Sequence, residues 1–135
     1  MRYFGVEEAN RLIPLLTRTF TVVRPWVERV HALVRELEDL QDAGAGPERT
    51  APPREERDAL IERIHAELEQ FQDLGMELKA ADGLVDFRAL KAGRPVYLCW
   101  RFGEPEVSHW HELEGGFAGR QPIVQARDFT PSYLS

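Results

Sequence analysis

The chain has 135 residues, a single cysteine and a formal net charge of −6, with 23 acidic against 17 basic residues. One cysteine excludes a disulfide framework within the chain, and the acidic excess, all of it within residues 1–82, argues against a nucleic-acid-binding surface. No apolar stretch in the sequence is long enough to span a bilayer. We therefore expect a single domain over residues 1–135, located in the cytoplasm, with no nucleic-acid or membrane partner.

The first half of the chain predicts two helices. Apolar residues recur three or four apart over residues 6–42, which indicates a long amphipathic helix, kinked or broken at Pro14 or Pro25. Glycine and proline without an apolar period predict a mobile loop over residues 43–53, and a second apolar stripe predicts a helix over residues 54–74. These stripes favour an antiparallel helical hairpin, and its remaining apolar surface predicts self-association into a homodimer.

The pattern changes in the second half of the chain. Short alternating runs separated by turn residues predict a small antiparallel β-sheet over residues 75–113. Residues 114–135 read as a glycine-rich loop followed by an irregular tail. The predicted fold class is α+β, in which a long antiparallel helical hairpin is followed by a small antiparallel β-sheet.

Residues 99–112 contain the only cysteine, two of the four histidines and two of the three tryptophans, and the arrangement of these side chains depends on how two predicted strands pair. Pairing Phe102 with Glu106 across a three-residue loop puts Cys99 opposite His109. One face then carries Tyr97, Cys99, Arg101, His109 and His111, and the other carries Val96, Leu98, Trp100, Phe102 and Trp110. This separation of polar from apolar side chains favours that register, with Trp100 and Trp110 as structural aromatic residues. Pairing Phe102 with Val107 would instead put Cys99 on the side of Trp110, away from both histidines.

The polar face of this predicted hairpin is a candidate metal site. His109 and His111 would lie about 7 Å apart along one face of a strand, near enough for two imidazoles to reach one ion. The remaining candidate ligands are the Cys99 thiolate and the carboxylates of Glu104 and Asp86, a donor set that suits a divalent metal such as zinc. The alternative is structural, with a small buried cysteine and with histidines hydrogen-bonded at the edge of the core.

Three arginines form a candidate anion-binding set. Arg94, Arg101 and Arg120 could bind a small anionic ligand, with backbone amides of the loop from Gly115 to Gly119 as further donors. The alternative is an internal set of ion pairs, in which the arginines are taken up by Asp86, Glu104 and Glu112.

Two further kinds of chemistry are suggested by spacing. Cys99 with His109 or His111 as base would form a nucleophilic pair, but the flanking Leu98 and Trp100 indicate a buried thiol. The units Glu28-x-x-His31 and Glu62-x-x-His65 have the spacing of di-iron sites in helical bundles, whose ligands point into the core. Here helical geometry places both glutamates away from the apolar stripes, so a metal would need a second chain to cover that face.

A series of short blocks in the second half is distinctive: Gly83 to Phe87, Gly93-Arg94, Val96 to Arg101, Gly103-Glu104, Trp110-His111-Glu112 and Gly116 to Gln121. Together with the opening from Phe4 to Leu16, these blocks resemble a bacterial family known as domain of unknown function 2203. The resemblance implies no particular activity. Its pattern includes Trp110-His111 but neither His109 nor Arg88, which favours His111 over His109 as a site residue.

These observations lead to two functional hypotheses, and they assign no catalytic residue. The first is a non-enzymatic, homodimeric interaction or scaffold protein, since much of the chain is helical and no complete catalytic set is visible. The second is a ligand-binding or metal-dependent activity on the sheet face that carries Cys99, Arg101, Glu104 and His111.

Overall fold

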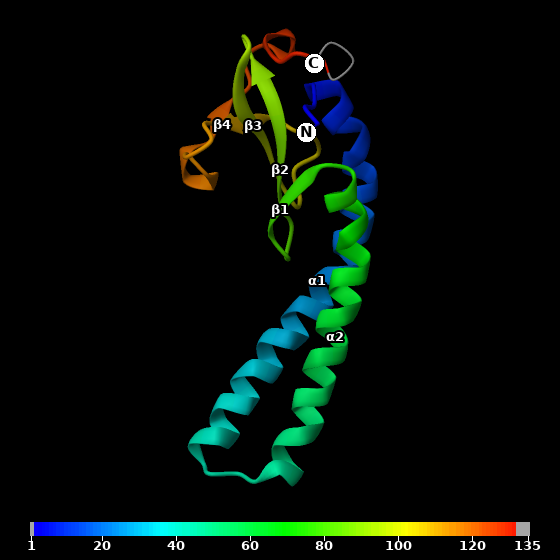
Figure 1. The fold of residues 1–135 in the computed structure, drawn as a ribbon, viewed down its shortest axis with the longest axis vertical. Coiled ribbons are helices and arrows are strands. Elements are labelled where there is room, and N and C mark those ends of the chain that lie inside the picture. The colour runs from blue at the N-terminus through cyan, green and yellow to red at the C-terminus, as the bar shows by residue number, and fades with distance from the viewer. Residues whose placement is uncertain (1, 132–135) are drawn as a thin grey trace.

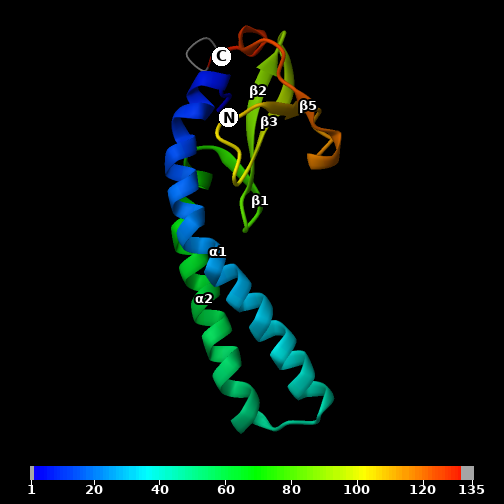
Figure 2. The same cartoon turned by 180° about the vertical axis from the view of Figure 1, so that it is seen from behind.

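The computed structural model describes residues 2–131, which form a helical hairpin followed by a sheet (Figure 1). Helix α1 (Val6–Asp42) and helix α2 (Pro47–Asp73) run antiparallel, and the sheet packs beside the half of the hairpin nearer the N-terminus. The other half projects beyond the sheet in both views (Figures 1 and 2). The predicted α+β class is confirmed. Neither helix is apolar enough over a sufficient length to cross a membrane.

Helix α1 has the predicted bounds and is unbroken over its 37 residues, so neither proline ends it. Pro14 and Pro25 both lie on its exposed side, where water can hydrate the carbonyl groups that lose an amide partner. The helix changes direction near its middle, so that its far part diverges from α2 (Figures 1 and 2). A bend of this kind is the expected response of a long helix to an internal proline.

The predicted loop over residues 43–53 is too long. In the structure only residues 43–46 separate the helices, and α2 begins at Pro47, well before the predicted start at residue 54. Pro47 occupies the first turn, where its missing amide costs no helical hydrogen bond. Pro52 and Pro53 lie inside the helix, beyond its first turn, so each lacks the amide that would bond the carbonyl group four residues earlier, and the helix continues despite this loss.

The sheet has five antiparallel strands in the order β1-β2-β3-β4-β5. Its strands are β1 (Met76–Ala80), β2 (Leu84–Lys91), β3 (Arg94–Arg101), β4 (His109–His111) and β5 (Gln121–Pro122). The fifth strand corrects the prediction of an irregular tail after residue 113, which also contains two short 3-10 helices, Phe117–Gly119 and Ala126–Asp128. Phe129 is buried in that tail and bridges to Lys91, while residues 132–135 lie outside the described part.

Strands β3 and β4 pair in the register that the apolar pattern favours, with Cys99 opposite His109 and Leu98 opposite Trp110. The predicted three-residue loop is wrong, because residues 102–108 all lie between the strands. This loop reaches α1: Val107 is buried, and its amide donates to Asn10 Oδ1 at 2.7 Å. The longer connection therefore serves to attach the sheet to the helix.

The two faces of the sheet differ as the alternation predicts. The face toward the helices is apolar and joins one core, to which the sheet contributes Val85, Phe87, Ala89, Val96, Leu98, Trp100 and Trp110. Trp100 lies 6.1 Å from Phe20 of α1 between ring centroids. The opposite face carries Asp86, Cys99 and His111, and these side chains are buried as well.

Candidate functional site

The buried polar face brings together three of the predicted metal ligands. Asp86 on β2 is the cross-strand partner of Cys99 on β3, and His111 on β4 lies one strand further along. One potential ligand atom from each of the three lies within 4.8 Å of the other two. Their exposed fractions are 3% for Asp86, 0% for Cys99 and 2% for His111, so bulk water does not hydrate these groups.

His111 is fixed by hydrogen bonds to both ring nitrogens. Nδ1 lies 2.7 Å from the backbone carbonyl oxygen of Glu112, and Nε2 lies 3.0 Å from Asp86 Oδ2. Because a carbonyl oxygen only accepts, Nδ1 carries a proton and donates it. Nε2 and Asp86 Oδ2 therefore share one proton across this hydrogen bond, or both atoms could bind one metal ion.

Asp86 has one oxygen that is not satisfied. Its Oδ1 is buried and accepts no hydrogen bond from any residue in the range 2–131. A buried carboxylate oxygen without a partner is destabilising, since it has lost its water and gained nothing in return. Asp86 Oδ1 can therefore accept one more hydrogen bond or ligate an ion at this cluster.

Cys99 does not have the properties of a nucleophile. Burial, followed by the negative charge of Asp86, raises the pKa of its thiol to about 12, despite the opposing effect of Arg120. His111 has no free ring nitrogen to accept the thiol proton, because both nitrogens are already engaged. The nucleophilic pair considered from the sequence is therefore not supported by the geometry.

The other two predicted metal ligands lie apart from the cluster. His109 Nδ1 is 3.0 Å from Ser108 Oγ and 3.7 Å from Glu104 Oε2. Glu104 Oε1 accepts hydrogen bonds from Arg120 Nη2 and from the Arg101 amide, both at 2.6 Å. Burial alone would raise the pKa of the Glu104 carboxyl, but these two donors hold it below its ordinary value. Glu104 thus anchors the loop after β3.

The three predicted anion-binding arginines have partners within the chain. Arg94 pairs with Glu112, and Arg120 pairs with Glu104 and also donates to the Cys99 carbonyl oxygen at 3.1 Å. The guanidinium carbon of Arg101 lies 5.5 Å from the centre of the Phe117 ring. The ion-pair alternative therefore describes Arg94 and Arg120, whereas the buried Asp86 pairs with His111 and not with an arginine.

A cavity of about 260 Å³ adjoins the cluster. Asp86 and His111 form part of its wall, together with Lys79, Tyr97, Leu113 and Phe117. Glu77 on β1 accepts hydrogen bonds from Lys79 Nζ at 3.0 Å and from Tyr97 Oη at 2.7 Å. Sequence reasoning missed Lys79. The signal was present, because strand alternation places Glu77 and Lys79 on the same face as Asp86 once β1 pairs with β2.

Comparison with protein families gives a match over most of this chain. The model of a family described as an uncharacterized conserved protein (DUF2203) matches residues 2–123. The chain belongs to the DUF2203 family. All three residues of the Asp86–Cys99–His111 cluster lie within the matched range. Comparisons with curated proteins and with solved structures gave no match.

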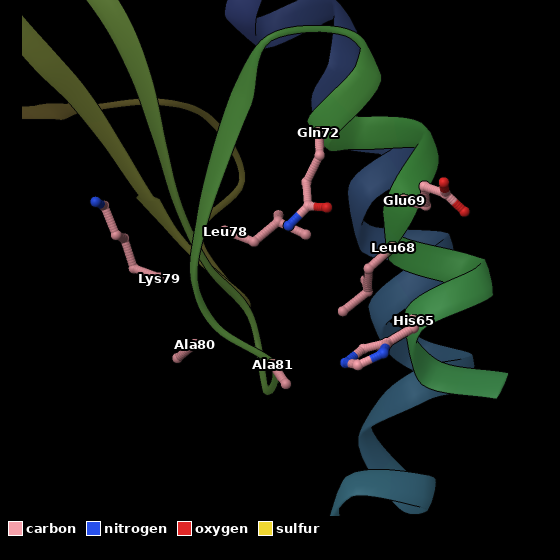
Figure 3. Close-up of a pocket in the computed structure, with 8 residues that line it drawn as sticks. All are labelled: His65, Leu68, Glu69, Gln72, Leu78, Lys79, Ala80 and Ala81. Atoms are coloured by element: carbon pink, nitrogen blue, oxygen red, sulfur yellow. The ribbon is translucent and has the colours of Figure 1, made fainter. Parts of the chain in front are cut away.

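A larger hollow of this DUF2203 chain, about 570 Å³, lies between α2 and the edge strand β1 (Figure 3). His65 and Leu68 of α2 face Leu78 and Ala81 across it, while Glu69 points away from the strand. The hollow includes none of the predicted metal or anion ligands. Glu62 and His65 are both exposed, so neither side chain points into the core as the ligands of a bundle di-iron site do.

Proposed function

We propose that this DUF2203 protein binds one divalent metal ion, zinc by preference, through Asp86, Cys99 and His111. The observation that supports the proposal is that three potential ligand atoms, one from each buried residue, lie within 4.8 Å of one another. In addition, Asp86 has a carboxylate oxygen, Oδ1, that has no hydrogen-bond partner within residues 2–131. Ligand atoms around tetrahedral zinc lie about 3.5 Å apart, so small side-chain rotations would complete the site.

The surroundings of the cluster favour a metal. A histidine that ligates through one nitrogen commonly donates its other ring N–H to a carbonyl oxygen, and His111 makes this bond to Glu112. The carboxylate of Asp86 and the thiolate of Cys99 would together balance the two positive charges of the ion. A mixed set of nitrogen, sulfur and oxygen donors suits zinc more than calcium or magnesium, which prefer oxygen alone.

Metal titration of the chelator-treated protein tests the proposal. We expect one zinc or cobalt ion to bind per chain, and His111→Ala to weaken binding by about a hundredfold or more, since it removes one of three ligands. His109→Ala is the matched control, because His109 lies on the same strand but outside the cluster. Equal binding by both variants, or no stoichiometric binding by the unaltered protein, would show that Asp86 and His111 share only a proton.

Self-association through the helices is a second proposed function, which would support an interaction or scaffold role. The far half of the hairpin projects beyond the sheet, and α1 exposes the apolar side chains of Val22 and Val34. We expect light scattering at micromolar concentration to give the mass of a dimer, and Val34→Lys to give a monomer. Val124→Lys, at an exposed site outside the hairpin, should remain dimeric. A monomeric mass for the unaltered protein would reject this proposal.

A further inference from the structure

The proposed metal site has three protein ligands and therefore leaves one position of a tetrahedral ion free. Within residues 2–131 the cluster contains no fourth histidine, cysteine or carboxylate. Glu104, the other carboxylate predicted as a ligand, is already bound by Arg120 and by the Arg101 amide. Zinc sites that keep an open position bind water or an exchangeable ligand there, in contrast to closed structural sites.

The cavity beside the cluster would give a ligand access to that free position. Asp86 and His111 contribute to the cavity wall, whereas Cys99 does not and is fully buried. A metal held by all three residues is therefore reachable only from the side of Asp86 and His111. We infer, on the basis of the proposed metal site, that this cavity binds a short-chain monocarboxylate with one carboxylate oxygen on the metal.

The lining of the cavity supports this class of ligand. Lys79 supplies an ammonium group close enough to Asp86 to interact with its charge, and Glu77 keeps the Lys79 pKa above its ordinary value through a hydrogen bond. The ammonium can donate to the second carboxylate oxygen. Leu84, Leu113 and Phe117 provide apolar walls for an aliphatic chain.

The volume of the cavity and the charge of its wall restrict the class of ligand further. At about 260 Å³ the cavity is smaller than the roughly 300–1,000 Å³ of pockets that take drug-sized ligands, so it suits an acid of only a few carbons. Glu114 adds a negative charge at the wall beside Leu113. This charge repels dianions such as dicarboxylates and phosphate more strongly than it repels a single carboxylate, which carries less negative charge.

Visible spectroscopy of the cobalt-loaded protein tests this inference with propionate as the probe. The bands of four-coordinate cobalt depend on its ligands, so we expect a saturable spectral change with propionate and none with the uncharged propionamide. Lys79→Gln should raise the dissociation constant of propionate about tenfold, because it removes the charged donor. Lys91→Gln is the matched control, since Lys91 is the only other lysine and stacks on Trp110 away from the cavity.

Lys79 and Leu113 are both exposed, so their variants are expected to fold. Leu113→Asp adds a negative charge to the cavity wall and should weaken propionate binding as well, without preventing cobalt binding. A cobalt spectrum that propionate leaves unchanged, or equal affinities in Lys79→Gln and Lys91→Gln, would overturn the carboxylate inference while the metal site stands. Failure of cobalt itself to bind would contradict the proposed function and the inference with it.

Discussion

Replacement of Trp100 by alanine is expected to lower the free energy of unfolding by about 3–5 kcal/mol. Trp100 is fully buried at the point where β3 meets α1, between Phe20 and Phe102. Its indole Nε1–H donates to the Glu104 carbonyl oxygen at 2.9 Å. The substitution removes the largest of the fully buried side chains and leaves that carbonyl oxygen without its donor.

Urea denaturation followed by circular dichroism measures this effect. Trp26→Ala is the control, because Trp26 is only partly buried on α1, where Arg63 stacks on its ring at 4.3 Å. We expect the control to cost about 1 kcal/mol or less, as is common for partly exposed positions. Equal losses in the two variants would mean that Trp100 does not join the sheet to the helix.

The second large effect is expected at His111. In the metal-free protein, His111→Ala should lower the free energy of unfolding by about 3 kcal/mol, because it leaves the Asp86 carboxyl group buried without its hydrogen-bond partner. The side chains of the pair are only 2% and 4% exposed, so water cannot take over the role of the histidine. Denaturation in the presence of a chelator isolates this contribution from metal binding.

A double-mutant cycle separates the charge of Asp86 from the loss of packing. Asp86→Asn removes the charge, so we expect the variant Asp86→Asn/His111→Ala to be more stable than His111→Ala alone by about 1 kcal/mol or more. His109→Ala should change stability by less than about 0.5 kcal/mol, since His109 is a third exposed and lies outside the cluster. Additive single-variant effects would show that Asp86 and His111 do not interact as a buried ion pair.

The elements with strong periodicity were predictable from the sequence. Helix α1 has a continuous apolar stripe, and its observed bounds, Val6–Asp42, match the predicted range. The pairing of Cys99 with His109 was predictable for a related reason. A shift by one residue would put Trp110 on the face opposite to Trp100 and Leu98, so burial of all three side chains selects one register.

Elements without a period were not predictable. The start of α2 was placed too late because Pro47, Pro52 and Pro53 resemble a loop in sequence. Pro47 is tolerated in the first turn of the helix, and the helix continues through the other two prolines. Strand β5 has only two residues, which is too short for any alternation to be seen. Its existence depends on hydrogen bonds to β4, a non-local contact that composition does not encode.

The location of the candidate site was predictable from the sequence, but the residues that form it were not. Alternation along β3 and β4 places Cys99, His109 and His111 on one face, and it does not say which histidine turns toward Asp86. Glu104 lies in the loop between these strands, where Arg120 from much later in the chain fixes its position. Such a contact depends on the tertiary structure and has no local signature.

The strands follow one another in space in the same order as in the chain. Each strand therefore pairs with its sequence neighbour, which lowers the contact order of the sheet and favours rapid folding. Asp86, Cys99 and His111 come from three consecutive strands of this meander, so their arrangement requires no pairing between distant segments. The length of the projecting hairpin does not affect this arrangement. Helical turns added at its far end would lengthen the hairpin without moving the three side chains.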